Sequence, residues 1–260
     1  MEIVYQVSDI WNQFQVEILT RQGIKAKEGH NSLHLKEKEY LSVEKFLTEW
    51  NIKPFKYPSF SKKELDNATY LSMEGIRDYG YPQPDDDLDY RYQVYSHICP
   101  KCGVAETQVN PFYIKGEPKW GKSKIFSLTW ELEKLFVEKE FYLEIFKPLG
   151  VEYLPVIIHR SGKVAETVVQ LKLPVVEEML DMTGIAYKEC PVCSKRRYES
   201  VVLDFLPGFK KKIDYPIFLS NEFFGPHYYG GYRRIFVSQE FRSLMTKLKQ
   251  INPERYIPTR

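Results

Sequence analysis

The chain of 260 residues lacks several features that would define its function at once. It contains no run of about 18 consecutive apolar residues, so no membrane-spanning helix is predicted. Its formal net charge is only +2, which argues against a nucleic-acid coat or a polybasic membrane binder. The first residues lack the basic and apolar regions of a secretory signal, so the cytoplasm is the expected compartment.

The common catalytic and nucleotide-binding motifs are also missing. The sequence has no G-x-S-x-G elbow, no G-x-G-x-x-G fingerprint, no P-loop and no H-E-x-x-H pair. An enzyme would need a site assembled from scattered groups, for example around His159, His227 and the acidic loop at 85–89. No spacing supports such a site, so the sequence favours a protein that binds over one that catalyses.

Aromatic residues, by contrast, are abundant, with 19 Tyr and 16 Phe. Their side chains bury large areas and favour strands, so we predict an α+β protein with a mixed sheet and short helices. Apolar spacing predicts helices over about 43–50 and 62–75, the second begun by a capping box at Ser61 and Glu64. The predicted strands are 90–98, 124–130, 151–159, 164–173, 198–205 and 233–238.

The four cysteines form two pairs with the same short spacing. The pairs are Cys99-Pro100-Lys101-Cys102 and Cys190-Pro191-Val192-Cys193. Two residues between thiols allow a tight turn that aims both sulfurs at one point, and two such turns complete a tetrahedral site. We therefore predict one structural zinc ion bound by Cys99, Cys102, Cys190 and Cys193. Four cysteine ligands leave no open position on the metal for catalysis.

Two other interpretations of the cysteine pairs stay open. Each C-x-x-C pair is also the pattern of a redox-active dithiol, although no thioredoxin-like βαβ pattern surrounds either pair. Alternatively, the two turns are independent and carry reduced, partly buried thiols. The pairs are far apart in the chain, so a shared metal requires either an inserted subdomain or two halves of the protein that meet at the ion.

A degenerate repeat offers a reason for this separation. Residues 135–141 (LFVEKEF) match 235–241 (IFVSQEF), and an apolar helical pattern follows each copy. Each copy ends in a Tyr-x-Pro segment, and a CPxC turn lies upstream of each. Chance is the alternative, since these residue types are those of any strand-to-helix junction. The predicted domains are an N-terminal layer at 1–90 and two related halves at 91–187 and 188–260.

Four aspartates make an acidic cluster shortly before the first cysteine pair. They are Asp85, Asp86, Asp87 and Asp89. The cluster lacks the alternation and the glycine of a calcium loop. It is either a solvated loop or a docking patch for a basic partner.

Two further kinds of segment carry candidate binding residues. Tyr228, Tyr229 and Tyr232 lie beside two arginines and form either a contact surface or loop packing. The basic runs 195–197 and 210–212 are candidates for phosphate contact. They keep a zinc-ribbon nucleic-acid-binding protein as the alternative function, although the near-balanced charge argues against nucleic acid as the partner.

The order of these features resembles the double-CXXCG motif proteins, a bacterial family of immunity proteins paired with contact-delivered polymorphic toxins. The resemblance covers about residues 95–260, and Ser194 stands where the doubled motif has its second glycine. The matching segments are both CPxC turns and the stretches 126–130, 146–151 and 236–238. The resemblance implies a non-enzymatic cytoplasmic protein that binds and neutralises a cognate toxin of its own cell.

Overall fold

The chain divides into two compact units. The computed structural model describes residues 1–85, 89–104, 107–199, 203–225, 230–252 and 255–260. Unit 1 comprises Met1–Asp66 and Val201–Phe205, and unit 2 comprises Asn67–Ser200 and Leu206–Arg260. Both units contain helices and strands, and the predicted α+β class is confirmed. The sequence placed domain boundaries near residues 90 and 187, and both positions lie within unit 2.

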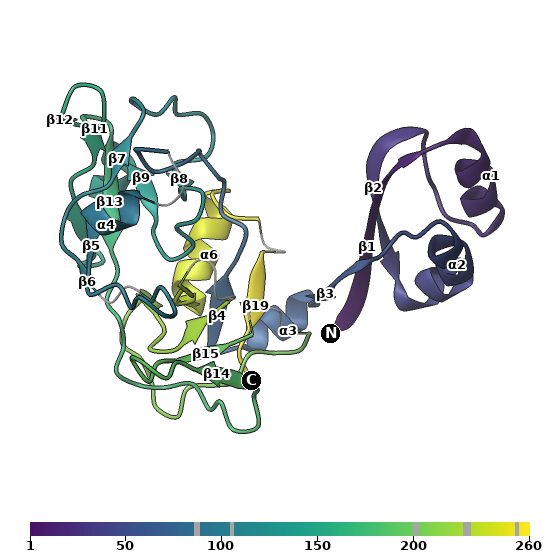
Figure 1. Cartoon of the computed structure of the whole chain (residues 1–260). Coiled ribbons are helices and arrows are strands. Elements are labelled where there is room, and N and C mark those ends of the chain that lie inside the picture. The colour runs from purple at the N-terminus through teal and green to yellow at the C-terminus, as the bar shows by residue number, and fades with distance from the viewer. Residues whose placement is uncertain (86–88, 105–106, 200–202, 226–229, 253–254) are drawn as a thin grey trace. The chain divides into compact units, whose positions relative to one another are not determined.

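Unit 1 is an antiparallel sheet with α1 and α2 packed against it (Figure 1). The strand order is β2–β1–β3, and alternate residues of β1 such as Tyr5 and Val7 are buried. They pack with Leu33 of β2 and with Val43 and Leu47 of α2. The elements are β1 (Glu2–Trp11), α1 (Gln13–Arg21), β2 (Gly29–Lys36), α2 (Glu37–Glu49), β3 (Phe55–Ser59) and α3 (Lys62–Asn67).

The predicted helix at 62–75 is shorter in the structure. The capping box is confirmed, because the Glu64 carboxylate accepts hydrogen bonds from the Ser61 backbone N–H and hydroxyl, both at 2.8 Å. The helix nevertheless ends at Asn67, and β4 (Tyr70–Met73) follows it. All four residues of β4 are buried between two neighbouring strands, so tertiary burial overrides the helical pattern here.

Unit 2 is built around two four-stranded sheets, ordered β10–β13–β9–β8 and β16–β18–β4–β19. Smaller sheets, ordered β12–β11–β7, β14–β15–β17 and β5–β6, complete it. The first half of its elements is α4 (Tyr90–Val94), β5 (Tyr95–Ser96), β6 (Thr107–Gln108), β7 (Tyr113–Ile114), β8 (Ile125–Phe126), β9 (Phe136–Glu138), α5 (Lys139–Phe141), η1 (Tyr142–Phe146), β10 (Glu152–Leu154), β11 (Ile157–Ile158) and β12 (Lys163–Val164). The others are β13 (Val168–Lys172), β14 (Tyr187–Glu189), β15 (Arg196–Tyr198), β16 (Ile217–Leu219), β17 (Phe223–Phe224), β18 (Ile235–Ser238), α6 (Gln239–Lys247) and β19 (Tyr256–Pro258).

The predicted strand at 90–98 begins as a helix. Apolar residues at 90, 92 and 94 have the period of a strand, but Tyr92 is 77% exposed. Helix α4 buries Tyr90 and Val94 instead, four residues apart on one face. Only Tyr95 and Ser96 continue as β5. The apolar alternation at 90, 92 and 94 was therefore misleading, because Tyr92 is an exposed residue of a helix and not a buried residue of a strand.

Both copies of the short sequence repeat form a strand that runs into a helix. Strand β9 leads into α5 and the π-helical turn η1, and β18 leads into α6. Ser238 caps α6 by accepting the backbone N–H of Phe241 at 3.2 Å. Such junctions are common, so at this level the duplication stays a prediction.

Aromatic side chains fill the core of unit 2. In the second sheet the ring of Phe236 lies 5.8 Å from that of Phe218 and 5.0 Å from that of Phe209. In the first sheet Phe136 and Phe126 stack at 5.4 Å. Such pairs add to the energy of area burial, which explains how a chain so rich in Phe and Tyr forms this core.

We expect Phe236→Ala to lower the free energy of unfolding by about 3–5 kcal/mol, because Phe236 is fully buried and its removal leaves a cavity. Urea denaturation followed by fluorescence measures the change. The matched control is Tyr92→Ala on the exposed face of α4, which should change stability by no more than about 0.5 kcal/mol. An equal effect of both variants would show that the second sheet is not a tightly packed core.

Candidate metal centre

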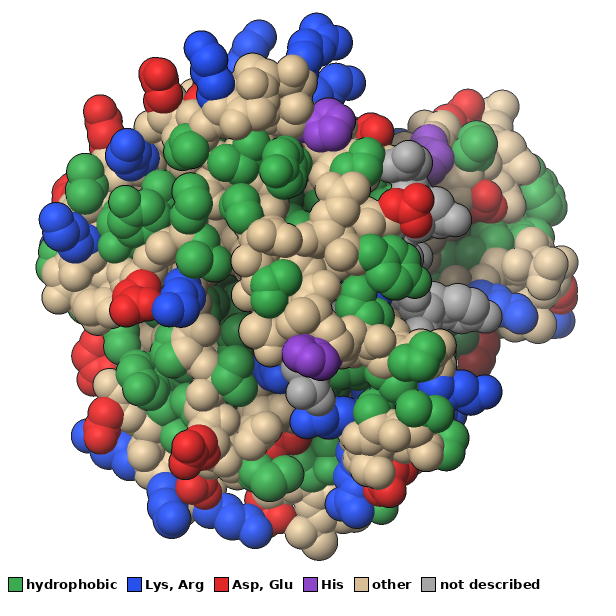
Figure 2. Space-filling model, turned by 60° about the vertical axis from the view of Figure 1, so that its left-hand side comes forward, with side chains coloured by type: hydrophobic (Ala, Val, Ile, Leu, Met, Phe, Trp, Pro, Cys, Tyr) green, Lys and Arg blue, Asp and Glu red, His purple; other side chains and the backbone are tan. Residues whose placement is uncertain are grey.

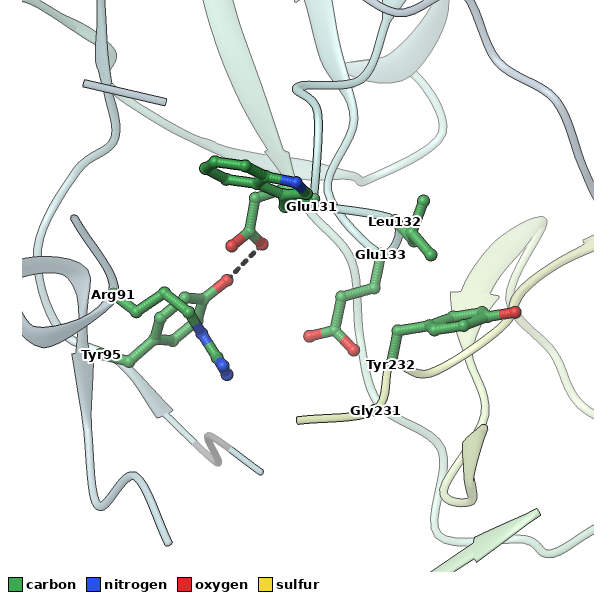
Figure 3. A pocket seen from close by; sticks show the side chains of 8 residues that line it. Arg91, Tyr95, Glu131, Leu132, Glu133, Gly231 and Tyr232 are labelled. Carbon is green, nitrogen blue, oxygen red and sulfur yellow. Dashed lines mark hydrogen bonds between the residues drawn. The ribbon is translucent and has the colours of Figure 1, made fainter. Parts of the chain in front are cut away.

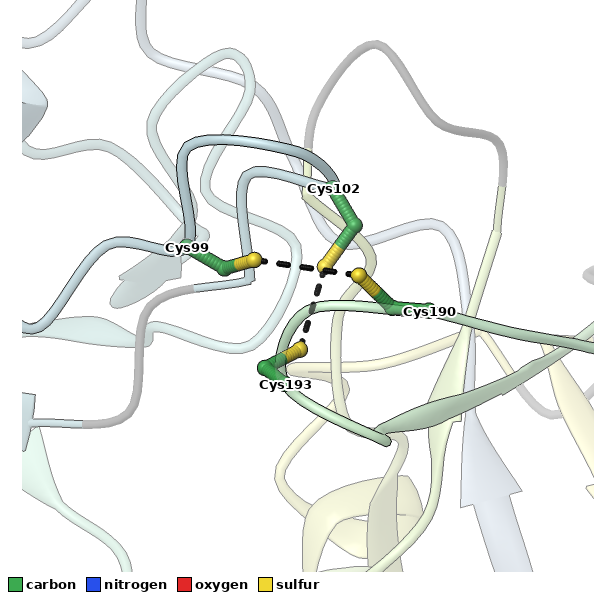
Figure 4. Close-up of side chains that lie close together, drawn as sticks. All are labelled: Cys99, Cys102, Cys190 and Cys193. Atoms are coloured by element: carbon green, nitrogen blue, oxygen red, sulfur yellow. Dashed lines mark hydrogen bonds between the residues drawn. The ribbon is translucent and has the colours of Figure 1, made fainter.

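Four cysteine sulfurs meet at one point of unit 2 (Figure 4). All four Sγ atoms lie within 4.8 Å of one another. Cys99 and Cys190 approach to 3.8 Å, and Cys102 and Cys193 to 3.6 Å. The structure therefore brings together the four residues that the sequence singled out, from two turns far apart in the chain.

The two turns have the same backbone structure. In the first, the N–H of Gly103 donates to the carbonyl of Cys99 at 2.8 Å, and the N–H of Cys99 donates to Val104 at 2.9 Å. In the second, Ser194 donates to Cys190 at 2.9 Å, and Cys190 donates to Lys195 at 3.0 Å. The residue after each second cysteine is left-handed, with φ of 70° at Gly103 and 57° at Ser194. Glycine adopts this conformation freely, whereas Ser194 adopts it at a cost.

The distances between the sulfurs fit a tetrahedral metal ion and exclude disulfides. The four cysteines are free thiols, and each shortest Sγ–Sγ distance is well beyond the ~2.05 Å of a disulfide bond. A tetrahedron with metal–sulfur bonds of ~2.3 Å has edges of about 3.8 Å, which is close to both shortest distances. Four thiolates are a donor set that suits zinc, although other soft metal ions prefer it as well.

The turns also prepare the thiols to lose their protons. Backbone N–H groups of Cys193 and Val192 point at the sulfur of Cys190 and lower its pKa to about 6. Backbone N–H groups, first that of Cys102, likewise lower the pKa of Cys99. Burial has the opposite effect on the second cysteine of each turn and raises the pKa of Cys102 to about 12. A divalent cation at the centre would supply the charge that keeps all four thiolates ionised.

The surroundings of the sulfurs are apolar and closely packed. Val104 and Phe223 are buried against the cysteines, and the guanidinium of Arg233 lies 4.2 Å above the Phe223 ring. The backbone of Gly230 passes so close to the first turn that an added Cβ would lie 2.0 Å from the carbonyl oxygen of Gly103. The second half of the chain therefore packs directly on the turn supplied by the first half.

A small polar cavity of about 30 Å³ is lined by Arg91, Glu131, Glu133 and Gly231 among others (Figure 3). This volume holds one or two water molecules. Glu131 lies on its wall and accepts hydrogen bonds from the hydroxyls of Tyr90 at 2.7 Å and Tyr95 at 2.6 Å. Glu133 accepts the backbone N–H of Arg233 at 2.7 Å. The cavity is a buried hydrogen-bond network, and its volume is too small for an organic substrate.

The other residues predicted to contact a partner differ in their exposure to solvent. Asp85 and Asp89 are described, and both are exposed. Tyr232 is half-buried on the wall of the small cavity, so most of its ring is not a free contact surface. The remaining predicted residues, Asp86, Asp87, Tyr228 and Tyr229, lie outside the described residues.

The structure adds an open groove that the sequence analysis did not identify. It has a volume of about 780 Å³, and its walls include Met179, Ile185 and Tyr187. Arg196 and Lys210, one from each basic run, also line it. The basic runs were visible in the sequence, but their common location was not, because it depends on the pairing of Gly208 and Phe209 with residues 180–181.

Known proteins add no identification. No protein-family model matches the chain, and no curated protein is significantly similar to it. In the described part of the chain, no helix has the length and apolar character needed to span a membrane.

We expect Cys99→Ser to lose the bound metal and to lower the melting temperature, because three thiolates remain where four close the site. Atomic emission analysis of the purified protein should give about one zinc per chain for the parent and almost none for the variant. The matched control is Ser96→Ala in the adjoining strand, which should keep its metal. Full metal content in Cys99→Ser would show that the four cysteines are not the metal site.

We expect Glu131→Gln to change the pH dependence of stability. Burial raises the pKa of Glu131, so the folded state favours its protonated form. This contribution is present below the ordinary carboxyl pKa and is lost as pH rises through the raised pKa. The advantage of the parent over the variant should therefore shrink between pH 4 and pH 8 in urea titrations. The exposed Glu144→Gln control should show no such trend, and a trend of the opposite sign would contradict the assignment.

Proposed function

We propose that the protein is a non-enzymatic immunity protein that binds and neutralises a toxin of its own cell in the cytoplasm. In this proposal a zinc ion at the four cysteines is a structural scaffold. The observation that carries the proposal is the closed four-thiolate centre, which joins distant parts of the chain and leaves no ligand position for a substrate. The resemblance of the doubled CPxC pattern to immunity proteins supports the choice of partner.

One aspartate of the acidic cluster that we assign to partner binding lies next to a helix that contacts the first cysteine turn. Asp89 directly precedes α4, and Arg91 of this helix donates to the carbonyl of Gly103 in the first cysteine turn at 2.7 Å. The exposed Asp89 is therefore connected to the first cysteine turn through one helix, and Asp85 is exposed as well. A charged residue fixed next to a helix in this way loses less entropy on binding than one in a free segment. Its charge suits a basic toxin, for example a nuclease.

A second candidate function is binding of single-stranded nucleic acid in the open groove. Arg196 lies 4.6 Å from the ring of Tyr187, and Lys210 lines the same groove. Cationic side chains beside an exposed aromatic ring are the features that hold a phosphate and a stacked base. The face drawn in Figure 2, however, carries acidic and basic side chains among many hydrophobic ones. A groove with two cations supports weak binding at most, so we rank this function second.

The deciding experiment is a nuclease-treated pull-down of the tagged full chain from its native cells, with captured proteins identified by mass spectrometry. We expect one stoichiometric toxin-like protein. Converting the four aspartates at 85, 86, 87 and 89 to asparagine should weaken its binding about 10- to 100-fold, because rim charges contribute modestly and jointly. The matched control converts four exposed glutamates elsewhere, Glu17, Glu28, Glu144 and Glu166, to glutamine and should bind like the parent.

Two outcomes would overturn this assignment. Equal affinity of the two quadruple variants would remove the acidic loop from the interface. Captured material that disappears on nuclease treatment would favour the second candidate. In that case a fluorescent dT15 oligonucleotide should bind with strong salt dependence, and Arg196→Glu with Lys210→Glu should abolish the binding.

A further inference from the structure

The two large sheets of unit 2 have the same strand order. One reads β8–β9–β13–β10 and the other β16–β18–β4–β19 from edge to edge. In each sheet the second strand (β9 or β18) runs into a helix, and the last strand (β10 or β19) follows that helix in the chain. The third strand, β13 or β4, is called the central strand below. Strands β9 and β18 are the two copies of the sequence repeat, so they provide a reference for comparing the sheets.

The central strands pair with these copies in the same register. Val137 faces Val169 in the first sheet, as Val237 faces Leu71 in the second. The residue before each of these valines in β9 and β18 is a phenylalanine that lies opposite a polar residue of the central strand. These pairs are Phe136 with Gln170 and Phe236 with Ser72. Gln170 and Ser72 are almost fully buried, and a buried polar residue at the same place in both sheets is a specific coincidence.

The correspondence extends to elements outside the repeat found in the sequence. It covers the first edge strands, the last edge strands, the strands beside the cysteine turns and a pair of parallel bridges. The matching pairs are Ile125–Val137 with Ile217–Val237, Tyr153–Leu171 with Tyr256–Met73, Ser96–Thr107 with Tyr187–Tyr198, and Asp78–Ser127 with Val175–Leu219.

In the chain, however, each central strand belongs to one half of unit 2, whereas in space it lies in the sheet of the other half. Strand β4 precedes the first cysteine turn but lies in the sheet built after the second turn. Strand β13 precedes the second turn but lies in the sheet built after the first. We infer that unit 2 consists of two equivalent halves, 67–160 and 161–260, which have exchanged their central strands, with the metal centre at their junction. This inference is independent of the proposed function.

Contacts between equivalent residues support a two-fold relation between the halves. Cys99 meets its counterpart Cys190, and Cys102 meets Cys193. At the corresponding position before β9 and β18, a carboxylate oxygen of Glu133 lies 3.8 Å from the guanidinium of Arg233. Equivalent positions meet each other only near an axis that relates the two halves. The metal therefore binds where the halves cross, and both the ion and the exchanged strands join them.

The exchange can be tested with the full chain cut between the halves. A protease site replaces the exposed turn Arg160–Gly162, and cysteines are introduced at Glu152 and Lys172. These residues face each other in β10 and β13, with Lys172 Nζ 2.6 Å from a Glu152 carboxylate oxygen. After mild oxidation of the zinc-loaded protein and cleavage, Glu152→Cys with Lys172→Cys should give one band of full-length mass on a non-reducing gel.

The matched control pairs Glu152→Cys with Glu74→Cys. Glu74 follows β4 at the place that Lys172 holds at the end of β13, so halves without exchange would put it opposite Glu152. Both residues precede the cut, so this variant should give two separate fragments on the gel. Peptide mapping should find no disulfide between positions 74 and 152. A disulfide between positions 74 and 152, with none between 152 and 172, would overturn the inference. Peptide mapping of the oxidised, uncut variants gives the same discrimination if the inserted site disturbs folding.

A second measurement follows the cut protein on a sizing column. The fragments should elute together, and they should stay together after a zinc chelator removes the metal, because each sheet still contains a strand of the other fragment. Release of the fragments by the chelator would show that the metal alone joins the halves, which contradicts strand exchange.

Discussion

The requirement that four thiols meet at one point constrains the rest of unit 2. Each CPxC turn can aim only two sulfurs, so the centre needs two turns, and the chain supplies them from distant positions. The surrounding structure has to hold both turns within about an ångström, because thiolate ligation is short-ranged and tetrahedral. Val104, Phe223 and the close pass of Gly230 over Gly103 provide this precision. The centre thus depends on tertiary packing as much as on its own ligands.

Strand exchange explains how such small halves can achieve this precision. Each four-stranded sheet contains strands of only two to five residues, which is marginal for an independently stable sheet. A central strand taken from the other half couples the two hydrophobic cores, so neither half can open without disrupting both. A metal ion at the four cysteines would add a second connection at the place where the halves cross. In this arrangement a structural ion would stabilise the relation between two sheets rather than a single small fold.

Local sequence signals predicted part of the local structure, whereas the predicted strands at 124–130 and 198–205 are strands only at Ile125–Phe126 and at Tyr198 among the described residues. The CPxC spacing predicted both turns, the capping box at Ser61 predicted the start of α3, and residues 235–238 form the expected strand. The predictions were wrong where tertiary contacts decide. Residues 70–73 continue a helical pattern but become the central strand of a distant sheet. The sequence also contains no signal for exchange, because registers between remote strands are set by the packing of the whole unit.

The places where the two halves differ are the most informative for function. Before the first cysteine turn, α4 buries Tyr90 and Val94, and their side chains complete the core beside β5 and β6. Before the second turn, residues 161–189 contain no helix, and Ile185 and Tyr187, the first residue of β14, stay exposed. A duplicated fold that served only stability would have no reason to cover one side and leave the other open. Helix α4 and the groove ahead of β14 are therefore departures from the common pattern, and under the proposed function such departures are where partner recognition is to be sought.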